Sequence, residues 1–560
     1  MQEPFYHELI TAIKKRKLTK QKLSNYKMQL CKKHGRKEMP TDIEILLNAD
    51  EKDIKKIKYL LQTKPVRSGS GVAVIAVMTK PFGCPHGKCT MCPGGPNSHF
   101  GDVPQSYTGN EPATMRGIRN NYDAYLQVMN RLEQYVVLGQ DAEKVELIIM
   151  GGTFPAMPST YQKEFVTYCY KAMNDFSKLF YTKGHLDILA FKRFFMMPGP
   201  VASPERIEKI HAELLKRKGK GNLLREQKKN EKADVRCVGM TIETRPDWGR
   251  KKQGNRMLDF GITRIELGVQ SVYGHALARL NRGHTTAESI ASIRELKDLG
   301  FKLNLHVMPG IPGIARKRDV KGLQLLFEDE DYRPDMLKVY PLMVMPGTPL
   351  YDDWKKGKFI PLTTAGAAEI ISEMKKDIPP YVRIMRVQRD IPTKFSAAGV
   401  DKNNLRQYIT AIMHKKGYTC HCIRCREPKG KLIGKPKLKI HHYIASQGNE
   451  FFITIETKNA LLGFLRLRFP SQCLRKEITP ETALIRELHV YSSQVGIGQK
   501  PKKGQSQHKG YGKCLLKAAE EIAKTYYKDK LVVISGIGVR DYYRKLGYRK
   551  EGPYMVKKII

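Results

Sequence analysis

The sequence predicts an α/β protein in which a partial parallel barrel of six strand–helix units is joined to a smaller α/β domain. Between about 71 and 345, short apolar runs alternate with segments of helical periodicity, the pattern of parallel βαβ units. After 440, alternating apolar segments precede a glycine loop, a helix and a strand, which indicates a separate small α/β fold. A third region, 1–67, has short amphipathic helical segments with one basic face.

The six predicted barrel strands are apolar runs separated by helix-length intervals. They lie at 72–78, 145–150, 236–242, 263–269, 302–308 and 336–341. Helical periodicity fills most intervals, for example Ala287–Leu299. Residues 216–232 are polar and basic, and we expect them to form an exposed insertion.

These patterns divide the chain of 560 residues into four regions. They are a basic N-terminal region at 1–67, the barrel at 68–395, a cysteine-bearing linker at 396–440 and the small α/β domain at 441–560. Within the last region we expect a helix at about 513–527 and a strand at 531–535. A chain of this length can bury a large core.

The composition is strongly basic, with 99 Lys+Arg against 55 Asp+Glu and a formal net charge of +44. The alternative is a Lys-rich soluble or thermophilic surface, but such surfaces usually balance Lys with Glu. We therefore expect a polyanionic partner, and charge alone leaves RNA, DNA and an acidic membrane open. The N-terminal residues expected to contact nucleic acid are Lys14, Lys15, Arg16, Lys17, Lys32 and Lys33.

Targeting and cysteine patterns suggest the compartment. No apolar run approaches the roughly 20 residues that cross a bilayer, and the N-terminus lacks the apolar stretch of a signal peptide. We therefore expect a cytoplasmic protein without a membrane contact. In that compartment the 11 cysteines are expected to be metal ligands or buried thiols rather than disulfides.

Three cysteines, Cys84, Cys89 and Cys92, lie within nine residues of one loop. Thiolates this close suit a [4Fe–4S] cluster, and three ligands leave one iron open to chelate S-adenosylmethionine. An electron from such a cluster cleaves the sulfonium and yields a 5′-deoxyadenosyl radical. The loop follows the first predicted strand, at the end of a parallel barrel where active sites lie. The alternative is a zinc knuckle or buried thiols.

A glycine pair, Gly151 and Gly152, follows the second predicted strand. Glycine lets a backbone approach a ligand closely, so we expect this pair to line the methionyl part of S-adenosylmethionine. A Gly-Gly after a strand is a weak signal alone, and it gains weight from the three-cysteine loop that precedes it.

A glycine loop opens a helix in the C-terminal domain, and its notable residues are Gln507, Gly510, Tyr511, Gly512 and Lys513. Successive backbone amides and a helix N-terminus suit the pyrophosphate of coenzyme A. Upstream, the predicted strand whose free backbone would line the pantetheine arm contains Glu487, Leu488, His489 and Val490. Downstream, Tyr543 is interpreted either as a core residue or as a hydroxyl near the thioester sulfur.

A second cysteine group, Cys420, Cys422 and Cys425, supplies three soft ligands within six residues. A structural zinc usually takes four Cys or His ligands, so we expect zinc here. The sequence leaves the fourth ligand open between His421, His414 and a distant residue such as Cys237. A redox or free-thiol role is the alternative.

With these motifs in place, the chain resembles the catalytic subunit of the Elongator complex, in its stand-alone archaeal or bacterial form, over nearly all of its length. Its two main domains resemble a radical S-adenosylmethionine barrel and a Gcn5-related N-acetyltransferase. The segments that carry the resemblance are Cys84–Gly95, Gln105–Arg116, Lys144–Phe154, Thr241–Pro246, Glu266–Tyr273, Asn281–Thr285, Arg386–Pro392, Arg486–Tyr491 and Gly552–Val556.

The resemblance implies an acyltransferase-class enzyme that installs a carboxymethyl group on carbon 5 of the wobble uridine of tRNA. In the family scheme the deoxyadenosyl radical takes a hydrogen from the methyl of acetyl-CoA, the carbon radical adds to uracil, and thioester hydrolysis releases the acid. Carried over to this sequence, Cys84, Cys89 and Cys92 hold the cluster. The implied acetyl-CoA contacts, with Lys144 and Tyr543 as catalytic candidates, are Lys144, Glu487–Val490, Tyr511–Lys513 and Tyr543.

The resemblance also implies an anticodon stem-loop as partner and a reductant for the cluster, and a homodimer is compatible with it. Because acetyl-CoA would bind in one domain and the radical would form in the other, we expect the two sites to face one another across a water-poor interface. The basic N-terminal region, 216–232 and the interdomain cleft are expected to hold the RNA. The alternatives are a protein or amine N-acetyltransferase with a structural cluster, and a non-catalytic RNA-binding scaffold.

Overall fold

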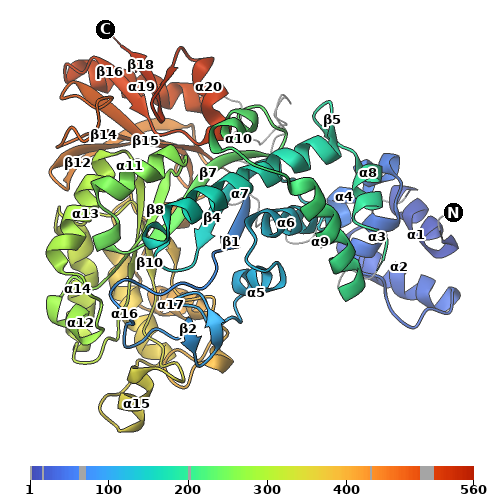
Figure 1. The fold of residues 1–560 in the computed structure, drawn as a ribbon, viewed down its shortest axis with the longest axis horizontal. Coiled ribbons are helices and arrows are strands. Elements are labelled where there is room, and N and C mark those ends of the chain that lie inside the picture. The colour runs from blue at the N-terminus through green and yellow to red at the C-terminus, as the bar shows by residue number, and fades with distance from the viewer. Residues whose placement is uncertain are drawn as a thin grey trace.

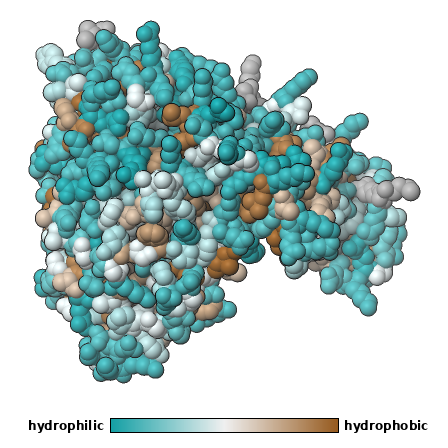
Figure 2. Space-filling model, viewed as in Figure 1, coloured by the Kyte–Doolittle hydropathy of each residue, from teal (hydrophilic) through white to brown (hydrophobic). Residues whose placement is uncertain are grey.

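The computed structural model describes residues 3–15, 18–61, 71–199, 203–428, 432–491 and 510–559. The N-terminal helices form a lobe at one end of the longest axis, and the C-terminal domain lies toward the other end (Figure 1). Hydrophilic residues cover most of the face seen in Figure 2. Within the described ranges, no helix is both long and apolar enough to cross a bilayer.

The N-terminal lobe consists of amphipathic helices, as the sequence predicts. Its helices are α1 (Pro4–Lys15), α2 (Lys20–Lys33), α3 (Asp42–Asn48) and α4 (Glu51–Leu61). Their apolar faces share a small core that includes Phe5, Leu9 and Ile45. The lobe is fastened to the rest of the chain by polar contacts, among them an ion pair between Lys58 Nζ and Asp141 Oδ1 at 2.5 Å.

The central region is built on a seven-stranded sheet in which every neighbouring pair of strands is parallel. In spatial order the strands are β1 (Ala73–Met78), β4 (Lys144–Met150), β7 (Arg236–Thr244), β8 (Arg264–Gln270), β9 (Lys302–Val307), β10 (Met336–Val339) and β11 (Arg383–Arg386). The first six coincide with the six predicted strands to within a few residues. The seventh is a strand that the sequence reasoning missed, because four residues with two arginines carry little strand signal.

Several helices of this region cover the outer face of the sheet, whereas α15 (Pro349–Lys355) projects away from it (Figure 1). The helices of this region are α5 (Pro112–Arg119), α6 (Ala124–Val137), α7 (Ser159–Phe180), α8 (Ile188–Phe194), α9 (Pro204–Lys218), α10 (Leu223–Asn230), α11 (Lys251–Asp259), α12 (Gly274–Arg279), α13 (Thr286–Asp298), α14 (Arg316–Glu328), α15, α16 (Thr364–Lys376), α17 (Leu405–Lys415) and α18 (Ile423–Arg426). Short hairpins are formed by β2 (Gly95–Ser98) with β3 (Gly101–Val103), and by β5 (Tyr181–Thr182) with β6 (His185–Leu186).

The segment 216–232 is only partly the exposed insertion that the sequence predicts. Its helix α10 buries Glu226 and Asn230, and the Asn174 side chain on α7 donates to Glu226 Oε2 at 2.7 Å. Glu231, just after α10, pairs with Arg540 in the C-terminal domain at 3.1 Å. The prediction was wrong for these residues because their partners lie far away in the sequence.

The C-terminal domain is a second seven-stranded sheet, of mixed direction. Its strands in spatial order are β12 (Lys437–Ala445), β13 (Gly448–Glu456), β14 (Leu461–Phe469), β15 (Thr482–Val490), β16 (Lys530–Val533), β18 (Tyr554–Lys558) and β17 (Arg549–Glu551), and its helices are α19 (Tyr511–Thr525) and α20 (Arg540–Arg544). Residues such as Phe451 and Leu465 pack with α19, whereas Phe452 and Phe464 join the apolar core of the barrel. One face of this sheet therefore closes on the barrel.

Buried ion pairs join the two sheets. Arg486 on β15 donates to Asp335 at 2.6 Å and to the Phe301 carbonyl at 2.8 Å, and Arg468 on β14 donates to Asp298 at 2.8 Å. Phe301 and Asp335 immediately precede β9 and β10. The C-terminal domain is thus fixed against the end of the barrel from which the strands start.

Candidate active site

The three-cysteine loop lies between β1 and β2, at the carboxyl end of the barrel strands. Cys89 and Cys92 are buried, and Cys84 is partly exposed. Cys89 and Cys92 pack with apolar side chains that follow β8 and β9, and Thr90 N–H donates to the Leu280 carbonyl at 3.0 Å. The loop is therefore held against the barrel opening, where the sequence predicts it.

Hydrogen-bond donors point at two of the three sulfurs. The Ser106 backbone N–H donates to Cys92 Sγ at 3.2 Å, and Arg282 Nη1 donates to Cys89 Sγ at 3.3 Å. His86 Nε2 also contacts Cys89 Sγ, at 3.2 Å. Such donors stabilise thiolates that bind a metal. This set of three cysteines with sulfur-directed N–H groups fits an iron–sulfur cluster.

The glycine pair lies beside the loop, at the carboxyl end of β4. Gly151 has φ +135° and Gly152 has φ +93°. A residue with a side chain is strained at these positive φ values. A Cβ on Gly151 would lie 1.9 Å from Thr79 Oγ1. The backbone therefore requires glycine at position 151, and its contact with S-adenosylmethionine stays a prediction.

The inner face of the barrel carries several charged residues and is partly exposed along the whole length of β4. Along β4, Lys144, Glu146, Ile148 and Met150 are half-buried, while Val145, Leu147 and Ile149 are buried in the apolar core. Arg264 on β8 pairs with Glu146 at 2.6 Å. Near the cluster loop, Tyr107 donates to Glu243 on β7 at 2.8 Å.

Sequence reasoning missed these inner-face residues as a group. Strands of a parallel sheet covered on both faces are usually apolar throughout. Here charged residues recur at alternate positions, as Arg264 and Glu266 do on β8. That alternation was the available signal that one face of the sheet lines a polar space.

In the C-terminal domain, β15 places the predicted acetyl-CoA strand at the start of the barrel strands. It pairs with β16 only from Thr482 to Ile485, while residues up to Val490 stay paired with β14. The two strands therefore separate after position 485, which leaves one backbone edge of 487–490 unpaired with β16. This edge fits the role predicted for the pantetheine contact.

The side chains of this strand reach the barrel residues. Burial lowers the pKa of His489 to about 4, and the charges that act on it include Glu487, Arg383 and Glu146. The Tyr491 hydroxyl accepts a hydrogen bond from Arg383 on β11 at 2.6 Å. Lys144, at the start of β4, has its pKa lowered mainly by burial. The unpaired edge of β15 therefore lies beside polar residues at the amino end of the barrel strands.

The sequence analysis expects the cluster and acetyl-CoA sites to face one another across an interface, and the structure places the two predicted sites at opposite ends of the barrel strands. The cluster loop lies at the carboxyl end of the barrel strands and β15 at the amino end. The seven residues of β4 span the interval between them, which is about 23 Å at 3.3 Å per residue. The barrel interior therefore lies between the two sites.

The remaining residues predicted to bind acetyl-CoA are divided between described and undescribed segments. Gly510, with φ +82°, immediately precedes α19, and Tyr511, Gly512 and Lys513 form its first turn. Tyr543 on α20 is buried in the core under α19, and burial raises the pKa of its hydroxyl. Gln507 lies outside the described residues.

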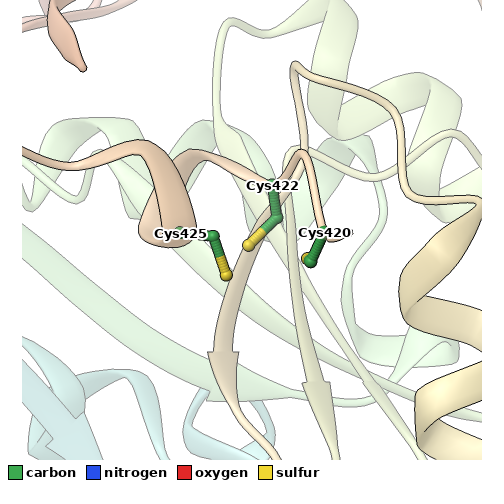
Figure 3. A group of neighbouring side chains, drawn as sticks. All are labelled: Cys420, Cys422 and Cys425. Carbon is green, nitrogen blue, oxygen red and sulfur yellow. The ribbon is translucent and has the colours of Figure 1, made fainter. Parts of the chain in front are cut away.

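The second cysteine group is compact. The sulfur atoms of Cys420, Cys422 and Cys425 lie within 4.8 Å of one another, and Figure 3 shows the three side chains converging. Lys375 Nζ donates to Cys420 Sγ at 3.1 Å. Hydrogen bonds from the neighbouring thiols lower the pKa of Cys422. In the described part of the chain, no fourth Cys, His or carboxylate atom joins the group, and this includes His414, His421 and Cys237.

The basic residues of the N-terminal lobe differ in their surroundings. Lys14 pairs with Asp53 at 2.9 Å, and Lys33 pairs with Glu8 at 2.7 Å. Lys15 and Lys32 are exposed. Arg16 and Lys17 lie outside the described residues. Lys15 and Lys32 are therefore the predicted contacts whose surroundings leave them most open to an anionic partner.

Comparison with family models defines the class. Residues 78–320 match the radical SAM superfamily, 334–415 match the radical SAM C-terminal domain, and 4–69 match the ELP3 N-terminal domain. The parallel sheet with its three-cysteine loop is thus a radical S-adenosylmethionine domain. This superfamily implies a [4Fe–4S] cluster and S-adenosylmethionine.

Relatives then define the family. The chain is 45% identical over 531 residues to the tRNA uridine(34) acetyltransferase of Methanocaldococcus infernus, covering 93% of this chain and 92% of that protein. It is 37% identical over 560 residues to Elongator complex protein 3 of Homo sapiens, covering 96% and 93%. The solved structure of Methanocaldococcus infernus Elp3 with an N-terminal deletion matches with a TM-score of 0.70 and 39% identity, covering 87% of this chain and 99% of that one. The chain belongs to the Elongator complex protein 3 family.

Proposed function

We propose that this enzyme is a tRNA carboxymethyluridine synthase. It modifies carbon 5 of the wobble uridine in the anticodon loop and uses acetyl-CoA as the source of the added group. The names of its archaeal relatives, which specify uridine 34 of tRNA, support the substrate. The net charge of +44 supports a nucleic-acid partner.

The observation that carries this proposal is the polar, partly exposed inner face of the barrel between the cluster loop and β15. An N-acetyltransferase with a structural cluster would need no polar space between the two. A reaction that brings an acetyl methyl to a radical needs one, because the reacting atoms must meet within a few ångströms. Half-buried side chains along the whole length of β4 are consistent with such a space.

The residues then have distinct proposed roles. Cys84, Cys89 and Cys92 hold the cluster, and Gly151 and Gly152 admit S-adenosylmethionine. When bound, these cofactors supply a radical that abstracts hydrogen. The β15 edge and the first turn of α19 hold acetyl-CoA, with Lys144 and Tyr543 close to its thioester.

The direct test is product analysis. The iron-reconstituted protein is incubated anaerobically with dithionite, S-adenosylmethionine, acetyl-CoA and unmodified tRNA, and the nucleosides are analysed by mass spectrometry. We expect 5-carboxymethyluridine, and none when either small molecule is omitted. Absence of a modified nucleoside despite bound tRNA and a full iron content would contradict the proposal. Dithionite replaces the physiological reductant that such a cluster requires.

We further propose that Cys420, Cys422 and Cys425 hold a structural zinc ion. Three thiols within 4.8 Å beside the Lys375 ammonium are suited to a thiolate-bound cation. Metal analysis of the purified protein should give about one zinc per chain. Cys425→Ser should lower the zinc content, whereas Cys473→Ser, at an exposed cysteine elsewhere, should leave it unchanged. Equal zinc in both variants would refute the assignment.

A further inference from the structure

A single buried carboxylate organises the middle of the barrel interior. Glu266 on β8 is 1% exposed. Its Oε1 accepts a hydrogen bond from Asn304 Nδ2 at 3.2 Å, and its Oε2 is 3.0 Å from His306 Nε2. The Lys338 ammonium on β10 also donates to Oε2. Three side chains from two neighbouring strands thus converge on one carboxylate.

This convergence fixes which atoms remain free. Burial raises the pKa of Glu266, but Lys338 and His306 more than offset this and hold it well below its ordinary value, so the carboxylate only accepts. Burial and the neighbouring Lys338 charge lower the pKa of His306, so its ring is neutral; it then carries its one proton on Nε2, which leaves a lone pair on Nδ1. Asn304 must direct its NH₂ at Glu266, which leaves its Oδ1 as an acceptor.

The free atoms have no partner within the described part of the protein. Asn304 Oδ1 is buried and unpaired among the described residues. His306 Nδ1 has no hydrogen bond to a described residue either, but the His306 side chain is 13% exposed. A buried acceptor without a donor is costly. One buried acceptor without a donor, Asn304 Oδ1, lies on the same face of β9 as the partly exposed His306 ring, and this pair indicates that a ligand with an N–H or O–H group completes the site.

The set faces the space where the two cofactors would meet. Leu303, Leu305 and Val307 pack in the apolar core, so Asn304 and His306 point to the opposite, inner face of β9. The His306 ring lies edge-on to Tyr340, with centroids 5.4 Å apart. Glu266 is in register with Glu243 on β7. Glu243 accepts a hydrogen bond from the Tyr107 hydroxyl near the cluster loop.

We propose that His306, positioned by Glu266, recognises the uracil ring of the target nucleotide by accepting its N3–H on Nδ1. A remaining N–H of Lys338 donates to a neighbouring carbonyl oxygen of the same ring. The inference rests on the proposed function, because it names how that substrate is held. Uracil offers a donor at N3 between two acceptors, whereas N3 of cytosine is an acceptor. His306 would therefore select uridine over cytidine.

The first test uses the unmodified protein and altered RNA. Anticodon stem-loops with uridine, 3-methyluridine or cytidine at position 34 are compared for 5-carboxymethyl product and for affinity by fluorescence anisotropy. Removal of the N3–H should lower product by about 10- to 100-fold. Affinity should change by less than about threefold, because phosphate contacts dominate RNA binding. Equal turnover of uridine and 3-methyluridine would overturn the inference.

The second test uses variants. His306→Phe should lower product from uridine to the level that the wild type gives with 3-methyluridine, so that the two RNAs become equivalent. His306→Gln, which can still accept, should restore part of the preference for uridine. His442→Phe, at an exposed histidine on β12, is the matched control and should retain the wild-type preference. A His306→Phe protein with normal iron content and an unchanged preference would also overturn the inference.

The outcomes separate this inference from the proposed function. No product from wild type with uridine 34 would contradict the function itself. Product from uridine 34, with equal product from 3-methyluridine 34, would leave the function intact and refute the role of His306.

Discussion

At the scale of single residues, Cys89 shows how the barrel positions a thiol that we propose as a cluster ligand. It is buried, and both His86 Nε2 and the Arg282 guanidinium contact its sulfur. Arg282 also donates to the Gly268 carbonyl at 3.0 Å, which anchors it to the end of β8. The ligand and its donor are therefore positioned by the sheet rather than by the loop alone.

Replacing this thiol should separate chemistry from RNA binding. We expect Cys89→Ser to lower the iron content and abolish uridine modification, because one cluster ligand is removed. Affinity for tRNA should stay nearly unchanged, since the basic surface is intact. Iron analysis, product assay and anisotropy measure the three effects. Cys473→Ser is the control, and full modification by Cys89→Ser would exclude the radical mechanism.

At the scale of elements, the sequence predicted what local patterns encode. Six strands and the motifs at Cys84–Gly95 and after β4 could be found because apolar runs, glycines and cysteine spacing are local signals. The strand β11 was missed, and the burial of helix α10 was mispredicted. Both errors arise because Glu226, Asn230 and Arg383 owe their positions to partners far along the chain. The Glu266 site depends on three separate strands, so only its alternating charges were visible.

The N-terminal helices should bind RNA phosphates through their exposed lysines. Lys15 at the end of α1 and Lys32 near the end of α2 are exposed. The variant Lys15→Ala/Lys32→Ala should weaken tRNA binding and reduce the slope of log affinity against log salt by about 0.7–0.9 for each lysine–phosphate pair that is removed. Lys517→Ala on α19 is a control at another exposed lysine, whose side chain is 79% accessible. An unchanged slope in the double variant would exclude these two residues from the RNA interface.

At the scale of the whole molecule, the buried ion pairs between the two sheets fix the position of the predicted acetyl-CoA strand β15 relative to the barrel. Asp335 lies between Arg486, at 2.6 Å, and Arg466, at 3.5 Å. Arg466 also donates to Glu487 on β15, at 2.9 Å. The start of β10 is thereby connected to the predicted acetyl-CoA strand.

Breaking this network should destabilise the protein. We expect Asp335→Ala to lower the free energy of unfolding by about 3–5 kcal/mol, because it leaves buried arginines without a partner.

Burial raises the pKa of Asp335, but the arginines hold it below its ordinary value. A depressed pKa in the folded state stabilises the fold above the unfolded pKa, so this contribution should be full at pH 7, begin to fall as the pH drops through about 4 and be lost only below the lower folded-state pKa. Denaturant unfolding at pH 7 and at a pH well below about 4 measures the contribution of Asp335 to the free energy of unfolding. Asp352→Ala, at an exposed carboxylate on α15, is the control, and equal effects of the two substitutions would contradict the argument.

The central claim is that the acetyl methyl group held by the C-terminal domain meets the radical formed in the barrel. The most direct measurement supplies acetyl-CoA with a fully deuterated methyl group to the reduced protein with S-adenosylmethionine and tRNA. The account predicts one deuterium in 5′-deoxyadenosine and two in the carboxymethyl group of the modified uridine. Unlabelled 5′-deoxyadenosine, formed alongside a modified uridine that carries no deuterium, would contradict it.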